Sequence, residues 1–356
     1  MGKKDKQQPI SLYEKGGWVN IPALARLGCW CYVIIGKRQV GKTYGTLKYM
    51  LEQNKYFLYL RRTSDEFDAV CADPVLNPFL PLEKEGYTVD IAKNKSISYT
   101  VGDYEKDEDG KHHIVKPRAV GMTLTSISKI RGFNGSMFSD VVFDEFIPER
   151  IVVKRKAEGD AMLNAYVTIN GNRELEGKPP LRLWLLANAF DMANGILMEM
   201  GLIPVLAKMM RQGLEYYVTD TGICVAMPKS EEVTDKRSQT AFIKHMAKQK
   251  NSKFYQMAME NKFSYNDLSN VRPMQLTHMI PAFVLDDMYV YEYDTQHYYV
   301  CRSRHDSREK YGTTSDNKKL FRQNYPWFQA YFSLHQVWCS DIEILIKLKE
   351  YLDIKD

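Results

Sequence analysis

A glycine-rich stretch early in the chain has the residue types and the spacing of a phosphate-binding loop. Residues 36–43 satisfy the pattern G-x-x-x-x-G-K-[ST], and they directly follow the apolar run 31–35. In such a loop, inward-pointing backbone N–H groups and the start of the next helix bind anionic phosphates. The pattern predicts Lys42 at the β- and γ-phosphates and Thr43 at a Mg²⁺ ion. The predicted phosphate-binding set is Gly36, Lys37, Arg38, Gln39, Val40, Gly41, Lys42 and Thr43.

Two adjacent carboxylates follow a second apolar run. Residues 141–146 read VVFDEF, which is the form of a buried parallel strand ending in two acids. In nucleotide hydrolases with such a loop, an acid at this strand end holds Mg²⁺. We therefore expect Asp144 to be a metal ligand together with Thr43, and Glu145 to be the general base that polarises the attacking water.

A third apolar run, residues 181–187, ends in Asn188. A polar side chain at this strand tip would meet the γ-phosphate, so we predict that Asn188 senses the nucleotide. The three motifs together predict ATP and Mg²⁺ as cofactors. The absence of recognisable helicase motifs after Asn188 argues against a helicase.

The pattern of the first 228 residues is that of an α/β domain. Apolar runs at 31–35, 56–60 and 119–124, besides the two above, alternate with helical stretches at 43–53 and 160–168. Such alternation predicts a mostly parallel sheet flanked by helices. We expect the first 10–20 residues to be loose, residues 105–111 to form a hairpin-like excursion, and residues 223–228 to form a final edge strand.

The rest of the chain changes in composition. Residues 229–265 are polar, basic and helical in pattern, which predicts a small helical linker or hinge. Residues 266–356 contain alternating aromatic strands around a turn at 294–296 and an amphipathic tail helix at 342–352, which predicts an α+β domain. The predicted domains are therefore 1–228, 229–265 and 266–356.

Composition limits the partners of this 356-residue chain. No apolar run reaches eighteen residues, and the polar, basic start has no apolar h-region, so neither a membrane span nor a signal peptide is expected. The net charge is +5, with six basic and no acidic residues between 236 and 253, and seven basic against three acidic residues between 302 and 322. These patches predict a polyanion partner.

Several strings, in order along the chain, resemble the DNA-packaging ATPases of small podophages, the phi-29-type motors among the terminase-like ASCE P-loop NTPases. Besides the phosphate loop and the acid strand at 142–147, they are Tyr59-Leu60-Arg61-Arg62, Asn172-Arg173-Glu174, Asn188-Ala189 and the hairpin at 288–302 followed by His305-Asp306. This resemblance implies ATP-driven translocation of double-stranded viral DNA into a preformed capsid.

The resemblance also implies an assembly. It predicts a homo-oligomeric ring, a pentamer, at the portal of the capsid, reached from the host cytoplasm, with a structural RNA as a further possible partner. ATP lies between subunits, so a basic residue acts in trans. Arg173 is the first choice, although Gly171 replaces a second arginine of the family pattern; Lys129 and Arg131 are further catalytic candidates, and Arg150 and Arg155 stay open.

For the C-terminal domain, the resemblance implies an RNase H-like fold that has lost nuclease activity. The available carboxylates are few for two-metal chemistry: Asp286, Asp287, Glu292 and Asp294. We expect contacts with DNA or the portal instead. The predicted nucleic-acid-binding residues are Lys244, Lys248, Arg302, Arg304, Lys318 and Lys319, with Arg322 beside them.

Three alternative functions remain at this stage. The first is another phage ring ATPase, such as a helicase-like nucleic-acid translocase, and the second is a terminase large subunit with an active nuclease. The third is a protein that uses ATP only as an assembly switch. Glu145 argues against the switch because a switch needs no dedicated base.

Overall fold

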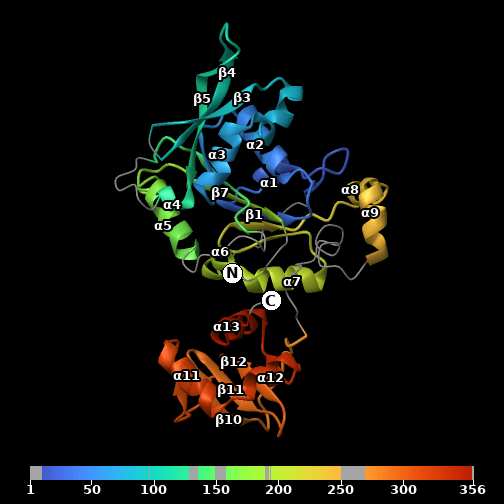
Figure 1. Cartoon of the computed structure of the whole chain (residues 1–356), viewed down its shortest axis with the longest axis vertical. Helices are drawn as coiled ribbons and strands as arrows, with labels where there is room; N and C mark the ends of the chain where they lie inside the picture. Colours follow the sequence, from blue (N-terminus) through green and yellow to red (C-terminus); the bar gives the residue numbers. More distant parts are fainter. Residues whose placement is uncertain are drawn as a thin grey trace, which may run out of the picture. The chain divides into compact units, whose positions relative to one another are not determined.

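The computed structural model describes residues 10–95, 97–127, 135–148, 158–188, 192, 194–249 and 269–354. The chain divides into two compact units, shown in Figure 1. Unit 1 comprises Met1–Glu199 and Met209–Ser264, and unit 2 comprises Met200–Lys208 and Tyr265–Asp356. Each unit is described by itself below.

Unit 1 is built on a nine-stranded sheet with the order β3-β4-β5-β2-β6-β7-β1-β9-β8. The six strands from β5 to β9 in that order run parallel, and the outer pairings β3–β4, β4–β5 and β8–β9 are antiparallel. The strands are β1 (Cys31–Gly36), β2 (Phe57–Arg61), β3 (Val89–Lys93), β4 (Tyr99–Lys106), β5 (His112–Thr123), β6 (Asp140–Asp144), β7 (Arg182–Asn188), β8 (Tyr216–Val218) and β9 (Ile223–Ala226).

Helices and short 3-10 turns precede, connect and follow these strands, and residues 203–208 at the start of one of the helices are assigned to unit 2. The helices and turns are α1 (Ile21–Ala25), α2 (Lys42–Glu52), α3 (Ser64–Ala72), η1 (Pro74–Leu76), η2 (Leu80–Glu85), α4 (Leu124–Ile127), α5 (Glu158–Asn170), α6 (Gly195–Glu199), α7 (Ile203–Gln212), α8 (Glu231–Ser238), α9 (Ala241–Met246) and η3 (Ala247–Gln249). Because β1 and β6 are buried at every position, both faces of the central sheet are covered, as expected for parallel strands.

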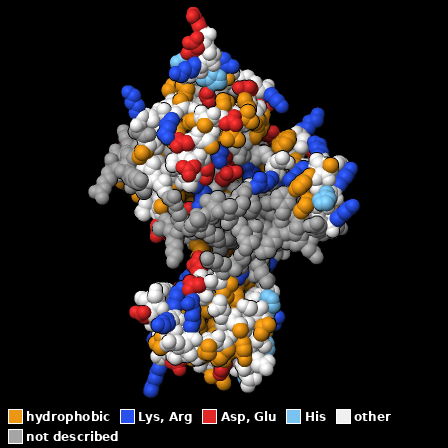
Figure 2. All heavy atoms as spheres, in the orientation of Figure 1, with side chains coloured by type: hydrophobic (Ala, Val, Ile, Leu, Met, Phe, Trp, Pro, Cys, Tyr) orange, Lys and Arg blue, Asp and Glu red, His pale blue; other side chains and the backbone are white. Residues whose placement is uncertain are grey.

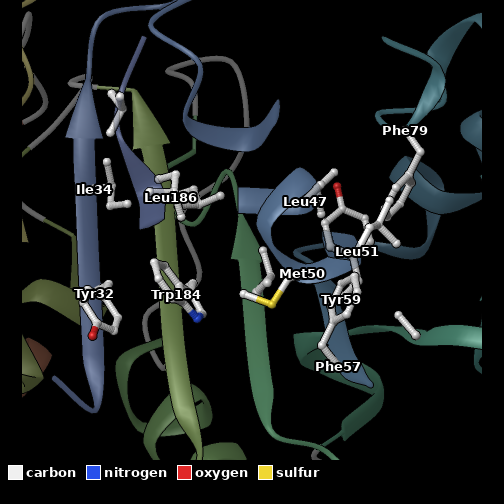
Figure 3. Close-up of a cluster of buried hydrophobic side chains, with 14 of the residues drawn as sticks. Tyr32, Ile34, Leu47, Met50, Leu51, Phe57, Tyr59, Phe79, Trp184 and Leu186 are labelled. Carbon is white, nitrogen blue, oxygen red and sulfur yellow. The ribbon is translucent and has the colours of Figure 1, made fainter. Parts of the chain in front are cut away.

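One face of the sheet packs against α2, as Figure 3 shows. Tyr32 of β1 stacks on Trp184 of β7, with ring centroids 4.2 Å apart. Met50 of α2 and Tyr59 of β2 belong to the same buried cluster. This packing holds the phosphate-loop strand, the acid strand and the helix after the loop in one rigid block.

The structure confirms most of the predicted elements and corrects two. The apolar runs at 31–35, 56–60, 119–124 and 181–187 are strands, and residues 43–53 and 160–168 fall in helices α2 and α5 with shifted ends. The strand at 223–226 is not an edge, because β8 pairs on its outer side. Residues 10–19 are not loose, since Val19 donates to the Val40 carbonyl and Tyr13 pairs with Val19.

The predicted excursion at 105–111 is the tip of the long β4–β5 hairpin, at the upper end of the view in Figure 1. Its exposed tip is rich in acids, which Figure 2 shows in red. Arg118 binds Asp103 across the hairpin through a bidentate contact with Nη2–Oδ2 at 2.7 Å. An acidic tip of this kind is unsuited to a DNA phosphate backbone.

Unit 2 contains a five-stranded mixed sheet with the order β13-β10-β11-β12-β14. Its elements are β10 (Ile280–Leu285), β11 (Met288–Glu292), β12 (Tyr298–Cys301), β13 (Lys310–Tyr311), α11 (Ser315–Asn324), α12 (Phe328–Ser333), β14 (Val337–Cys339) and α13 (Ile342–Tyr351). A cluster of aromatic rings around Phe283 joins the sheet to the helices. The α+β character, the hairpin at 288–302 and the tail helix are confirmed, whereas the RNase H-like topology stays a prediction.

The search for membrane-spanning helices covers the described residues. None of the helices found there combines the length and the apolar character needed to cross a bilayer.

Candidate active site

The phosphate loop has the backbone geometry that its glycines predict. Gly41 adopts a positive φ of 86° at the N-cap of α2, where a side chain would be strained. A Cβ at Gly41 would lie 3.1 Å from the Trp18 ring, so glycine also lets the N-terminal segment approach the loop. Gln39 has a positive φ of 64° as well. The chain therefore curls between β1 and α2, as a phosphate cradle requires.

Lys42 lies buried at the centre of this loop. Its Nζ donates to the carbonyls of Gly36 at 3.1 Å and Lys37 at 2.7 Å, and to Asn188 Oδ1 at 3.1 Å. Burial lowers the pKa of Lys42 to about 8, although the nearby Asp144 acts to raise it. A buried cation with a lowered pKa is held in the fold at an energetic cost, which a phosphate anion would offset.

The strand order brings the predicted metal ligands together. Because β7 lies between β1 and β6, the carboxyl ends of three parallel strands meet beside the loop. Thr43 Oγ1 donates to Asp144 Oδ1 at 2.9 Å. A hydroxyl and a carboxylate beside phosphates are the protein ligands that Mg²⁺ takes in such sites. The residues present therefore fit the predicted metal.

An arginine from the neighbouring strand β2 contacts both acids of the predicted pair. Arg61 Nη1 donates to Glu145 Oε2 at 3.2 Å, and Arg61 Nη2 lies 3.7 Å from Asp144 Oδ2. Tyr59, two residues earlier on the same face of β2, donates to Asp144 Oδ2 at 3.3 Å. The predicted base and the predicted metal ligand are thus positioned by side chains of one strand.

Glu145 itself sits in a strained turn. It has a positive φ of 55°, which is uncommon for a residue with a side chain. The next residue, Phe146, donates its N–H to the Leu186 carbonyl, which pins the chain directly after the turn. The Glu145 carboxylate points to solvent, with 58% of its side chain exposed. A water molecule can therefore reach it.

The phosphate loop, the two acids and Asn188 line one cavity of about 710 Å³. Trp18, which is 47% exposed, and Tyr44 add aromatic faces that suit a nucleobase. The remaining lining residues are Arg38, Gln39, Gly41, Lys42, Thr43, Pro81, Lys84, Glu85, Asp144, Glu145, Ala187 and Asn188. The volume and the mixed lining fit a nucleotide with its phosphates over the loop.

Arg173, the predicted trans-acting residue, is buried within its own subunit. Its Nη1 donates to the carbonyls of Ser136 at 2.9 Å and Phe138 at 2.8 Å, and its Nε donates to the Pro179 carbonyl at 3.2 Å. These bonds brace the loop after α5 against the segment before β6. The other trans candidates, Lys129, Arg131, Arg150 and Arg155, lie outside the described residues.

We predict that Arg173→Ala destabilises the fold. Three carbonyls would lose a charged donor, which costs about 2 kcal/mol or more in the free energy of unfolding. Urea unfolding of the two proteins measures this. Lys178→Ala is the matched control, since Lys178 forms an exposed ion pair with Glu176 in the same loop. Equal stability of Arg173→Ala and wild type would contradict the bracing role.

The predicted nucleic-acid residues differ in their local partners. Arg302 forms ion pairs with Asp341 and Glu343, and Lys318 and Arg322 both pair with Asp353. Four of the set are exposed and form no ion pair with a described residue: Lys244 and Lys248 in unit 1, and Arg304 and Lys319 in unit 2. These four are better placed to bind a polyanion.

The four carboxylates considered for a nuclease do not form a metal cluster. Lys347 binds Asp287 at 2.6 Å, Tyr298 donates to Glu292 at 3.0 Å, and Asp294 caps the β11–β12 turn and contacts His297. Among the described residues, no group of three or more His, Cys, Asp or Glu side chains could hold a metal ion.

Sequence reasoning missed Arg61, Tyr59 and Trp18 as site residues. For the first two a signal existed, because Tyr59 and Arg61 share one face of a strand that ends in two arginines. No local sequence pattern marks Trp18. It belongs to the segment before α1 and reaches Gly41 only by tertiary packing.

The fold and the site together define a P-loop NTPase of the ASCE class, with an added strand between the loop strand and the acid strand. A sequence model of one family matches residues 24–275, and its description is podovirus DNA encapsidation protein (Gp16). That match covers well over half of the chain, so the chain belongs to this family.

Two solved structures resemble the chain over nearly its whole length. The bacteriophage phi-29 viral genome packaging motor assembly is 19% identical, with a TM-score of 0.63, and the match covers 96% of this chain and 99% of that chain. The Phi-28 gp11 DNA packaging motor is 15% identical, with a TM-score of 0.60, over 96% and 100%. These likenesses show the fold. No curated protein matches in sequence.

Proposed function

We propose that this chain is the ATPase of a DNA-packaging motor, which couples ATP hydrolysis to the movement of double-stranded viral DNA into a preformed capsid. The observation that carries the proposal is the 2.9 Å contact between Thr43 and Asp144, with Glu145 beside it, in a member of the encapsidation family. A Mg²⁺-binding pair next to an exposed carboxylate is the arrangement needed for nucleotide hydrolysis.

The geometry supports a role for each side chain. Lys42 and the loop N–H groups would neutralise the β- and γ-phosphates, and Thr43 and Asp144 would hold Mg²⁺, whose positive charge would offset that of the phosphates. Glu145 accepts the proton of the attacking water. Asn188, already bonded to Lys42, contacts the γ-phosphate side of the site.

We further propose that Arg61 controls when Glu145 acts. The Arg61 guanidinium occupies one oxygen of the Glu145 carboxylate and fixes the orientation of that side chain. Release of the 3.2 Å contact would free Glu145 to take the proton. Tyr59 and the Asp144 carboxylate remain as partners for Arg61.

The proposal includes a homo-oligomeric ring, a pentamer, in which a basic residue of one subunit completes the site of its neighbour. If Arg173 is that residue, its loop must open from the three carbonyls that now hold it. Lys129 and Arg131 are the alternatives. Mixed rings of Arg173→Ala and Lys42→Ala subunits test the idea. Where an Arg173→Ala subunit supplies the loop and a Lys42→Ala neighbour supplies the arginine, the interface has both groups intact, so ATP hydrolysis should return there.

The proposed partners follow from charge and from the family. Unit 1 up to residue 228 would hydrolyse ATP, residues 229–265 would act as the hinge, and residues 266–356 would contact DNA or the portal. Figure 2 shows Lys and Arg side chains on the α8–α9 segment. A structural RNA is a further possible partner, and the motor would act at the portal vertex in the host cytoplasm.

The first test is the ATPase rate of the full chain against added duplex DNA at several salt concentrations. We expect the rate to rise with duplex DNA and the apparent DNA affinity to fall with salt. Lys244→Ala and Lys248→Ala should each lower the slope of log affinity against log salt by about one, whereas Lys178→Ala should leave it unchanged.

The same assay separates the competing functions. Stimulation by single strands with strand separation would favour a helicase-like translocase. DNA cleavage in the presence of Mg²⁺ or Mn²⁺ would favour a terminase with an active nuclease. Hydrolysis unaffected by any DNA, also in the presence of the assembled portal, would contradict the packaging proposal.

A further inference from the structure

The residues that line the nucleotide cavity fall into two chemically different sets. The first set is the phosphate loop with Asp144, Glu145 and Asn188, and its polar groups are accounted for by phosphates, a metal ion and water. The second set comes from elements that end no strand of the sheet: Trp18 before α1, Tyr44 in α2, and Pro81, Lys84 and Glu85 in η2. Its aromatic and apolar surfaces have no use for a phosphate, whereas the flat, apolar part of a nucleotide is its base.

Trp18 offers an exposed ring on a fixed backbone. Its carbonyl accepts from the Glu14 N–H at 2.8 Å, and the carbonyl of the preceding residue, Gly17, accepts from Ser230 Oγ at 2.6 Å. A Cβ at Gly17 would lie 2.7 Å from that oxygen, so glycine is needed for the contact. The ring nevertheless remains half-exposed beside the cavity. Because the backbone is already ordered, a stacked ligand would not have to order it.

The turn η2 is fastened to α2 in a similar way. Glu85 Oε1 accepts from the Tyr44 hydroxyl at 2.9 Å, and Glu85 Oε2 accepts from Lys48 Nζ at 3.0 Å. Leu82 of the same turn is buried in the core, while Pro81 is exposed and lines the cavity. Both contributions to the second set are therefore held in place by packing against the loop and its helix.

The polar groups of the second set are poorly suited to distinguishing one base from another. Both carboxylate oxygens of Glu85 already accept a hydrogen bond, and the Lys84 side chain is exposed. A site rejects the wrong ligand strongly only when that ligand leaves buried polar groups unpaired. Water can pair exposed groups instead. Stacking on Trp18 depends on the ring face, which every base has, and a purine has a larger face than a pyrimidine.

We propose that Trp18 and η2 form a nucleobase subsite that binds purines by stacking and reads no hydrogen-bonding edge, so that ATP and GTP bind with similar affinity. The inference rests on the proposed function, because it requires that the loop bind the triphosphate. Trp18 packs on Gly41, the last glycine of the loop, which places its ring next to the phosphate cradle. The substrate class of the site is therefore the purine nucleoside triphosphates.

The test is calorimetric binding of three Mg²⁺-loaded ligands to the full chain: ATPγS, GTPγS and inorganic tripolyphosphate, which has no base. We expect the two nucleotides to bind within about tenfold of each other, and each roughly tenfold or more tightly than tripolyphosphate, because stacking adds to phosphate binding. In Trp18→Ala the affinity for both nucleotides should fall roughly tenfold. The affinity for tripolyphosphate should change less than about twofold, since the loop is intact.

Two further variants make the result specific. Trp18→Phe keeps an aromatic face, so it should recover most of the nucleotide affinity that Trp18→Ala loses. Glu14→Gln is the matched control, because Glu14 is exposed in the same turn and does not line the cavity. Its affinity for all three ligands should equal that of wild type.

Several results would overturn the inference. An equal loss for tripolyphosphate in Trp18→Ala would assign Trp18 to the shape of the loop, and unchanged nucleotide affinity would remove it from the site. Wild-type binding of GTPγS about a hundredfold weaker than that of ATPγS would show recognition of the base edge. Each of these results leaves phosphate binding, and with it the proposed function, standing. If the wild-type protein bound none of the three ligands, the proposed function itself would fail.

Discussion

Replacing Glu145 by glutamine is expected to reduce ATP hydrolysis by about 10²- to 10⁴-fold, the usual contribution of a positioned general base. Glutamine keeps the size of the side chain but cannot accept a proton from water. Thr43 and Asp144, the proposed Mg²⁺ ligands, are untouched, so nucleotide binding should persist. Single-turnover hydrolysis and calorimetric binding on the same preparation measure the two effects separately.

A matched control exists on the other side of Arg61. Glu66 lies 3.8 Å from Arg61 Nη1, on the same guanidinium nitrogen that contacts Glu145. Glu66→Gln therefore removes a carboxylate from the same arginine without removing the proposed base, and hydrolysis should stay near the wild-type rate. If the Glu145→Gln variant hydrolysed ATP within a few-fold of the wild-type rate, another group would have to be the general base for the attacking water.

Replacing Lys42 by alanine is expected to abolish turnover and to weaken nucleotide binding roughly 10- to 100-fold, the cost of losing a charged donor to phosphates. The stability of the nucleotide-free protein should fall much less than its affinity for nucleotide. Burial lowers the pKa of Lys42 from 10.5 to about 8, which corresponds to a penalty on the order of 3 kcal/mol for its charged form. Thermal unfolding of the free protein should therefore show little loss of stability.

The lowered pKa of Lys42 also gives nucleotide binding a pH dependence. Below about pH 8 the amine is charged and ready for phosphates, and above it the free site loses that charge. ATP affinity should then fall as the pH rises, by up to about tenfold per unit, with uptake of a proton on binding. Calorimetry at pH 8.5 in buffers of different ionisation enthalpy detects this proton.

The lowered pKa of Lys42 makes fold stability rise with pH, whereas ATP affinity falls with pH. The folded-state pKa of Lys42 lies below the unfolded value, so the unfolded chain binds more protons between about pH 8 and 10.5. The penalty is fully present below pH 8 and is relieved as the pH rises through that window. Lys42→Arg, which stays charged, should show no proton uptake on binding ATP. Uptake in this variant would assign the proton elsewhere.

Much of the nucleotide site was predictable because its parts are neighbours along the chain. The loop at 36–43 follows its strand directly, and Asp144 and Glu145 end theirs. Apolar runs predict the strands, and carboxyl ends of parallel strands share one edge, so the loop, the acids and Asn188 were expected to meet. Burial of the basic residue Arg173 was not predictable, because its acceptors are main-chain carbonyls that carry no sequence signal.

The sequence by itself therefore determined the class of protein, the loop and the acids of the candidate site, and the order of the elements. Only the tertiary structure decided which strands lie side by side, and with them the contacts of Arg61 with Glu145, Trp18 with Gly41 and Arg237 with the loop. The physical reason is that hydrophobic periodicity gives the buried face of an element but not its neighbour. Neighbours are selected by packing of the whole sheet, where distant segments such as 10–19 and α8 close over the same loop.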